Sequence, residues 1–281
     1  MTSGTVFHRT RTPLTVRFEA ARLMTVSKQG VSAQNLQRVT DLGSYQTAWT
    51  MPHKFRTAMT SSGRSRLSGR GGMDETYIGG RGKLGATGRG AAGKTVVAGA
   101  IECRGRGFGR ARLQIIPDAS AAILAAFLRS HVSRGATVIT DAWPAYPVAI
   151  AAAEAAHEVR NVAASGEPAH LSLPGVHRLF SLTKRVLDGT HQGSAQPEHL
   201  QEHLQAYLDE FVFRFNRRRS RKRGMLFFRL LQAAVAGSPA PYKDIAAIHR
   251  KPLLVPMPPP FPHDLPRTLT GLPIEHPWRA A

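Results

Sequence analysis

Residues 95–141, TVVAGAIECRGRGFGRARLQIIPDASAAILAAFLRSHVSRGATVITD, alternate between strand-like and helix-like patterns. They predict strands over 95–101 and 108–116, a helix over 119–131 and a short strand over 136–140. Another strand is expected just before them, at 73–78 (MDETYI). After them we expect a helix at 145–156, a strand at 157–162, and helices at 176–187 and 198–215. This order predicts a mixed α/β domain whose five-stranded sheet is flanked by helices.

The first 60 residues carry helix patterns and helix caps. A helix is expected to follow Pro13, a second to run over 33–40 behind the cap Ser32, and a third to follow Ser44 to about Met59. The tight connection at 41–43 between the second and third helices predicts a helix-turn-helix.

The third of these helices offers side chains that could contact bases and phosphates: Gln46, Lys54 and Arg56. The alternative is an ordinary three-helix packing element with a solvated polar face. Pro52 lies inside the same helix and predicts a kink or a loss of about 3 kcal/mol.

Composition divides the chain into four parts. We expect a helical DNA-binding region at 1–60, a Gly-, Ser- and Arg-rich linker at 61–72, the α/β domain at 73–236 and a tail at 237–281. The tail holds 11 of the 19 prolines and is expected to be extended.

The chain is strongly basic, with 38 Lys and Arg against 18 Asp and Glu and a net charge of +20. Such a balance indicates a polyanionic partner, most often nucleic acid. An anionic membrane surface is the weaker alternative, since no long basic amphipathic helix is present. The single cysteine, Cys103, excludes a disulfide framework and a multi-cysteine zinc site. Without an apolar run of 18 residues or a signal-like N-terminus, a cytoplasmic, nucleoid-associated protein is expected.

A dense basic run follows the last predicted helix of the α/β domain and includes Arg217, Arg218 and Arg219. Phenylalanines are interleaved just before it. A solvated charged run is the general alternative, but the net charge favours contact with DNA phosphates.

Two aspartates stand at strand ends: Asp74 at the start of the first strand, and Asp141 directly after the fourth. If these two strands are neighbours, as in a ribonuclease-H-like sheet, the carboxylates could share two divalent cations at a phosphodiester. Taken alone, the pair is weak evidence, because caps and turns explain most such residues.

Two other patterns are weaker evidence for a function. Residues 88–95, GRGAAGKT, match the phosphate-loop pattern, but a strand rather than a helix is expected to follow, so a basic hairpin loop is favoured over nucleotide binding. His199 and His203 have the spacing of metal ligands on a helix, yet a surface or packing pair is the better interpretation.

Six phrases together resemble the DDE transposases of bacterial insertion sequences that carry the ISXO2-like transposase domain (the IS1595 family). They are GVSAQNLQRVTDLGSYQTAW at 30–49, MDETYIGG at 73–80, GRGAAGKTVV at 88–97, VITDAWPAY at 138–146, VHRLFSLTKRVLDGTHQG at 176–193 and HLQEHLQAYLDEFVFRFNRR at 199–218. The resemblance covers most of residues 5–235 in family order.

The resemblance implies a ribonuclease-H-like domain that cuts and joins double-stranded DNA with Mg²⁺ or Mn²⁺ (two ions), working as a homodimer or higher oligomer. Asp74 and Asp141 match the first two metal-binding acids, and Lys184 matches a catalytic lysine. His177 occupies the position of the third ligand, and Glu210 is the reserve candidate for a third carboxylate. His177, Ser181 and Lys184 are spaced to share one helix face.

The chain also departs from the family pattern. Arg17 takes a Trp position, Pro52 stands where a helical Leu is expected, and the lead-in to Asp74 is rich in Gly. A truncated, inactive remnant that only binds DNA is therefore the alternative function.

Overall fold

The computed structural model describes residues 2–60, 65–79, 94–160, 172–191, 197–222 and 224–247; in the fifth range, side chains are described from Glu202 onward. The predicted elements at 80–93, 161–171 and 248–281, including most of the phosphate-loop pattern and of the proline-rich tail, lie outside the described residues.

A five-stranded mixed sheet forms the core of the α/β domain, with strand order β3-β2-β1-β4-β5. Its strands are β1 (Arg70–Ile78), β2 (Thr95–Arg104), β3 (Gly107–Ile116), β4 (Thr137–Thr140) and β5 (Ala156–Val159). The first three pair antiparallel, whereas β4 pairs parallel with β1, and β5 parallel with β4. The predicted fold class, a ribonuclease-H-like α/β domain with a five-stranded sheet, is confirmed.

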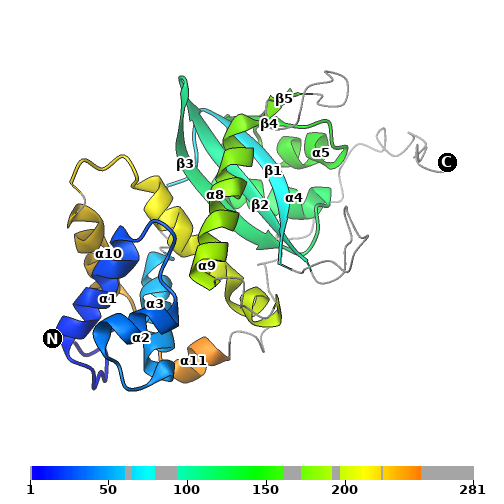
Figure 1. Cartoon of the computed structure of the whole chain (residues 1–281). Helices are drawn as coiled ribbons and strands as arrows, with labels where there is room; N and C mark the ends of the chain where they lie inside the picture. The colour runs from blue at the N-terminus through cyan, green and yellow to red at the C-terminus, as the bar shows by residue number, and fades with distance from the viewer. Residues whose placement is uncertain are drawn as a thin grey trace.

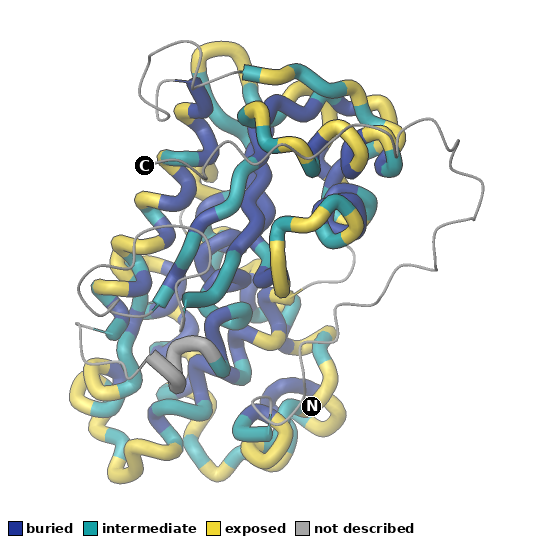
Figure 2. Tube along the Cα trace, turned by 90° about the vertical axis from the view of Figure 1, so that its right-hand side faces the viewer, coloured by how far each residue is buried: buried dark blue, intermediate teal, exposed yellow. Residues whose placement is uncertain are grey.

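Helices cover both faces of this sheet (Figure 1). α8 (Pro174–His191) and α9 (Pro197–Asn216) pack on one face, and α4 (Ala121–His131) and α5 (Ala145–Ala152) on the other. Along β1, Ile78 joins the core beneath α8 and α9, while Met73 joins the core beneath α4 and α5. Because side chains alternate along a strand, the even-numbered positions of β1 face α8. Figure 2 shows the buried positions following the strands and the inward sides of the helices.

The N-terminal helices form a second core, which we call the helical module. It contains α1 (Leu14–Val26), α2 (Ala33–Thr40), α3 (Tyr45–Met59) and α10 (Gly224–Ala236). The predicted caps are confirmed, since the Ser32 hydroxyl accepts the N–H of Asn35 at 3.1 Å and that of Ser44 accepts the N–H of Thr47 at 3.4 Å.

The sequence did not predict α10 as part of this module. Leu230 and Ala234 of α10 lie in one buried cluster with Ala20 and Ala21 of α1. A short helix, α11 (Tyr242–Ala246), follows within the region expected to be extended, and its Tyr242 ring lies 6.2 Å from that of Trp49 on α3.

The sequence placed the start of the first strand incorrectly, whereas Pro52 lies inside the third helix as expected. β1 begins at Arg70 rather than Met73, so the Gly-rich residues 71 and 72 are strand. A Cβ on Gly71 would lie 2.8 Å from the carbonyl oxygen of Ile101, so glycine at this position permits β2 to approach closely. Composition alone had assigned Gly71 to the linker. Pro52 lies buried inside α3, which continues through it as a helix.

Candidate functional site

Strand pairing brings Asp74 and Asp141 to the same level of the sheet. β1 and β4 run parallel, with Gly72 paired to Ile139. Asp74 lies two residues beyond Gly72 on β1, and Asp141 lies two residues beyond Ile139, directly after the end of β4, so both aspartates follow this pair in the same direction. Neighbouring strands are about 4.8 Å apart, which brings both carboxylates within reach of one bound group.

Each aspartate is held by a nearby backbone N–H. Asp74 Oδ1 accepts the N–H of Glu75 at 2.8 Å, and Asp141 Oδ1 accepts that of Trp143 at 3.0 Å. The second contact is an Asx-type turn that fixes the chain as it leaves β4. The Asp74 side chain keeps 17% of its surface exposed, so it is held but still reachable from solvent.

α8 approaches the sheet closely because glycines lie at its contact points. A Cβ on Gly99 of β2 would lie 2.5 Å from the Phe180 ring, and a Cβ on Gly175 of α8 would lie 2.7 Å from the Phe108 ring. Each missing side chain leaves room for an aromatic ring. The first turns of α8 therefore rest directly on the sheet beside Asp74.

This close packing brings His177 to Asp74. His177 Nε2 lies 3.7 Å from Asp74 Oδ2, and the histidine side chain is 30% exposed. Further along the same helix, Ser181 and Lys184 are exposed, and the Ser181 hydroxyl donates to the His177 carbonyl at 3.0 Å. Of the five predicted catalytic residues, the structure therefore brings His177 to Asp74, and it sets Asp141 directly after β4, the strand that neighbours β1.

Sequence reasoning missed a second layer beneath the aspartates. Tyr146 of α5 is fully buried, and its hydroxyl donates to Glu75 Oε1 at 2.5 Å on the sheet face opposite to Asp74. Burial first, and then the negative charges of Glu75, Asp74 and Asp141, raise the pKa of Tyr146 well above its usual value. The phenol thus stays protonated and ties α5 to β1. Both residues lie in phrases that the sequence analysis quoted, but nothing in those phrases distinguished them from core residues.

The donor set suits a hard divalent cation only in part. Two carboxylates at adjacent strands supply the oxygen ligands that Mg²⁺ and Mn²⁺ prefer. Within the described parts of the chain, however, no three His, Cys, Asp or Glu side chains gather closely enough to hold a metal ion. The fit therefore rests on the aspartate pair, with His177 as the neighbouring imidazole.

Glu210 lies elsewhere, in the contact between α9 and α3. Its side chain is 4% exposed, and its Oε2 accepts Nε of Arg56 at 2.9 Å. Arg214 lies on the other side, 3.5 Å from Oε1. A carboxylate already occupied by two guanidinium groups does not fit the reserve role of third ligand. Arg56, which is 2% exposed and stacks 4.1 Å from the Tyr207 ring centre, does not fit the expected DNA contact.

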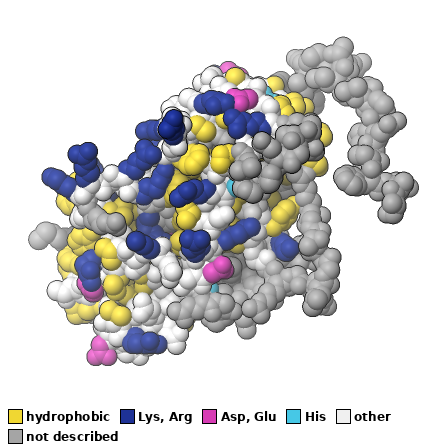
Figure 3. Space-filling view, turned by 45° about the horizontal axis from the view of Figure 1, so that its top comes forward, with side chains coloured by type: hydrophobic (Ala, Val, Ile, Leu, Met, Phe, Trp, Pro, Cys, Tyr) yellow, Lys and Arg dark blue, Asp and Glu magenta, His cyan; other side chains and the backbone are white. Residues whose placement is uncertain are grey.

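The remaining DNA-contact candidates lie at the surface to different degrees. Gln46 is exposed and Lys54 is half-buried, both on α3. Arg217 stacks on the Phe213 ring at 3.9 Å, whereas Arg218 donates to the carbonyls of Phe108, Gly109 and Phe215. Figure 3 shows Lys and Arg side chains spread over the visible face, with acidic side chains at only a few places.

The structure does not support a function for the phosphate-loop pattern or for the histidine pair. Thr95, the last residue of the phosphate-loop pattern, opens β2, whereas such a loop should lead into a helix. His199 lies among the side chains that are not described, and His203 is 8% exposed, with its ring 4.9 Å from that of His53 and 5.1 Å from that of Trp49.

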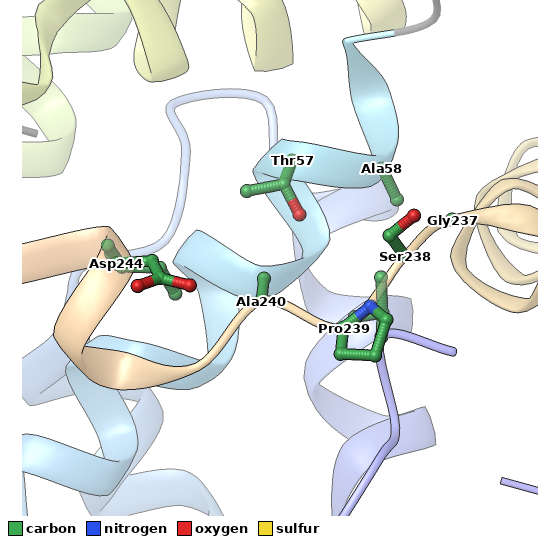
Figure 4. Close-up of a pocket in the computed structure, with 9 residues that line it drawn as sticks. Thr57, Ala58, Gly237, Ser238, Pro239, Ala240 and Asp244 are labelled. Carbon is green, nitrogen blue, oxygen red and sulfur yellow. The ribbon is translucent and has the colours of Figure 1, made fainter. Parts of the chain in front are cut away.

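One pocket of about 330 Å³ opens on the helical module, away from the aspartates (Figure 4). Its lining comes from the end of α3, at Thr57 and Ala58, from residues 237–240, and from Asp244 and Ile245 around α11. No residue of β1, β4 or α8 contributes to it, so it is separate from the candidate active site.

Comparisons with known proteins agree with this geometry. The family model described as ISXO2-like transposase domain matches residues 66–216, while no curated protein matches the chain. In the part of the chain that the structure describes, no helix has the length and apolarity needed to cross a membrane. The match runs over more than half of the chain and over every element that positions Asp74 and Asp141, so the chain belongs to the family of proteins with the ISXO2-like transposase domain.

Proposed function

We propose that this protein is a transposase that cuts double-stranded DNA at the ends of an insertion sequence and joins the freed ends to target DNA. The observation that supports the proposal best is that His177 Nε2 lies 3.7 Å from Asp74 Oδ2 on β1, while Asp141 follows directly after β4, the parallel neighbour of β1. Family membership supports the transposase role, and the net charge of +20 supports DNA as the partner.

In the proposed reaction, water attacks a phosphodiester at the element end and releases a 3′-hydroxyl, which then attacks a phosphodiester of the target. Asp74, Asp141 and His177 would hold Mg²⁺ or Mn²⁺, which neutralises charge at the reacting phosphate when bound. Lys184, exposed on the same face of α8, would contact a neighbouring phosphate. In-line displacement depends on the positions of the reacting groups more than on covalent catalysis. The close packing of α8 on the sheet would fix the positions of His177 and Lys184. Joining two ends implies at least a homodimer, acting on the nucleoid.

The second candidate function is DNA binding without cleavage. It is favoured by one observation, the absence of three closely gathered ligand side chains among the described residues. Incubating the purified chain with its element ends and Mn²⁺ or Mg²⁺ separates the two. Specific cleavage at the ends supports the transposase, whereas binding without any strand break supports the remnant.

We predict that His177 sets the metal preference of the reaction. Imidazole suits later transition metals better than Mg²⁺, which demands oxygen ligands in near-octahedral geometry. The wild type should therefore cut DNA faster with Mn²⁺, His177→Glu should restore use of Mg²⁺, and His177→Ala should lose activity with both. Cleavage rates titrated against each metal measure this.

Ser181→Ala, one turn along α8, is the matched control and should keep the wild-type preference. Equal metal preference in the wild type and both His177 variants would remove the histidine from the metal site and leave it as a helix residue that pairs with Asp74.

We predict that two neighbouring arginines of the basic run separate into different roles. Arg219 is exposed and makes no hydrogen bond among the described residues, so Arg219→Gln should make the log–log salt dependence of DNA affinity shallower by about 0.9, the contribution of one phosphate. Arg218 joins the end of α9 to β3 through the carbonyls of Phe108 and Gly109 and also donates to the Phe215 carbonyl of α9, so Arg218→Gln should lower the free energy of unfolding by about 1–3 kcal/mol.

Fluorescence anisotropy over a salt series and urea denaturation check the two effects. An unchanged salt slope for Arg219→Gln, with a changed slope for Arg218→Gln, would reverse the assignment.

A further inference from the structure

A second cavity, of about 250 Å³, lies where the helical module meets the α/β domain, and we call it the seam cavity. Residues 25–28, at the end of α1 and just after it, supply one part of its lining. The end of α9 and the basic run after it supply another, with single residues from α8 and α10. The chain that leaves α1 passes beside the end of α9 (Figure 1). The cavity is therefore built jointly by the two parts of the protein.

The charged side chains that line the seam cavity are all basic: Lys28, Arg214, Arg217 and Arg218. None of the described residues of its lining is acidic. Arg214 lies 3.5 Å from Glu210 Oε1, but the same carboxylate also accepts Arg56, so one negative charge serves two guanidinium groups. A hollow lined by charges of one sign concentrates ions of the opposite sign. The seam cavity is thus suited to an anion.

The backbone that carries Lys28 is held in place on both sides of this residue. The Ser27 carbonyl, just before it, accepts a hydrogen bond from Nη1 of Arg214. The Gln29 carbonyl, just after it, accepts the Thr190 hydroxyl at 3.1 Å. Because α9 and α8 each hold one neighbour of Lys28, this part of the lining keeps its place against the α/β domain.

Two of the four cations are placed to meet a ligand that enters from solvent. Lys28 and Arg217 are both exposed, and both line the seam cavity. Arg217 stacks 3.9 Å from the Phe213 ring centre and donates through Nη1 to the Phe213 carbonyl at 3.0 Å, which orients its guanidinium. Arg218, in contrast, is bonded to three backbone carbonyls. The helical module and the α/β domain therefore each offer one accessible cation to the same cavity.

We infer that the seam cavity binds one phosphate of the DNA backbone between Lys28 and Arg217. The inference rests on the proposed DNA-binding function and adds a contact that joins both parts of the protein to one duplex. A phosphate suits the pair, because the guanidinium offers a planar fork of donors and the ammonium a compact charge. DNA is the source that fits best, because the basic run continues beyond the cavity with further exposed cations for neighbouring phosphates: Arg219, Arg221 and Lys222.

The test uses the full chain and a duplex of arbitrary sequence, with dissociation constants measured over a salt series. Lys28→Gln and Arg217→Gln should each weaken binding about 10-fold, the contribution of one hydrogen bond to a charged group. Each should also make the log–log slope shallower by about 0.9, the loss of one phosphate contact.

The double variant tests whether the two cations share a phosphate. Because either single change already removes the shared contact, Lys28→Gln with Arg217→Gln should bind little worse than the single variants. Independent contacts would instead multiply to a loss of about 100-fold. A double variant that reaches this product to within about twofold would assign the cations to separate phosphates and overturn the inference.

Two further variants separate a specific contact from a general loss of positive charge. Lys243→Gln is the matched control, since it removes an exposed lysine of α11 that is not part of the cavity lining, and it should leave the slope unchanged. Arg217→Lys keeps the charge without the planar fork and should keep most of the slope. The denaturation midpoint of Lys28→Gln should equal that of the wild type, so its weaker binding would not reflect unfolding. A wild-type slope in Lys28→Gln would overturn the inference.

Inorganic phosphate without DNA tests the other source of the same chemistry. If phosphate raised the denaturation midpoint of the wild type but not of Lys28→Gln, while both bound DNA with equal slopes, the cavity would be a site for free phosphate and the DNA contact would be wrong. Wild-type slopes in both single variants, beside a wild type that binds and cuts DNA, would defeat the inference alone. A wild type that does not bind duplex DNA even at low salt would overturn the inference and the proposed function together.

Discussion

Replacing either Asp74 or Asp141 by Asn should reduce cleavage of the element ends by about 10³-fold or more, while DNA binding stays intact or tightens. Removing one group that stabilises charge in a transition state commonly costs about 10²–10³ in rate, and here each aspartate is also proposed to hold a metal. Binding should not suffer, because the substitution removes a negative charge that repels the DNA backbone. Strand breaks on labelled ends and anisotropy with the same duplex measure the two effects.

Asp188→Asn provides the matched control for these variants. Asp188 is an exposed carboxylate of the same charge on α8, three turns and about 16 Å beyond His177 along the helix axis. It should cut DNA at the wild-type rate. Wild-type cleavage by Asp74→Asn or Asp141→Asn would contradict the proposed role of the aspartate pair, whatever the behaviour of the control.

The strands that carry this pair could be predicted from sequence because strand patterns are local. Strand periodicity located β1 and β4, but it set Asp74 at the start of its strand, whereas β1 begins at Arg70 and Asp74 lies inside it. The helix caps Ser32 and Ser44 were equally accessible, since a cap bonds a backbone N–H three residues away. Such features depend only on residues that are close together in the sequence.

The rest depends on partners that are distant along the chain. Arg56 lies in a polar-looking helix beside Lys54, and only the arrival of α9 shows that one is buried and the other is not. The sequence likewise could not show that Glu210 is buried, since its partner Arg56 is 154 positions away along the chain. The pairing of Glu75 with Tyr146 and the docking of α10 in the helical module likewise required the folded chain.

The burial of Arg56 and Glu210 leads to the largest expected effect on stability. Glu210→Gln should lower the free energy of unfolding by about 3–5 kcal/mol, because it leaves the guanidinium groups of Arg56 and Arg214 in a buried site with no carboxylate between them. Arg56→Met should cost a similar amount by leaving the carboxylate with only Arg214, at 3.5 Å. Chemical denaturation of each variant measures this.

The double variant, Arg56→Met with Glu210→Met, shows how much of the lost stability comes from an unpaired buried charge and how much from lost packing. Replacing both members by apolar side chains of similar volume should recover much of the lost stability, since buried pairs often contribute little over a hydrophobic contact. As a control, breaking the exposed pair of Arg22 and Glu19 should leave the free energy of unfolding almost unchanged, because solvent screens this pair.

The same variants decide whether Glu210 has a part in catalysis. If its role is to join α9 to α3, the double variant should fold and still cut DNA, because the aspartates stand on β1 and after β4, outside this contact. A double variant that regains stability but shows no cleavage, with DNA binding intact, would contradict the structural role and return Glu210 to the active site. Variants of the buried ion pair therefore test whether a change at Glu210 affects the stability of the fold, the cleavage of DNA or both.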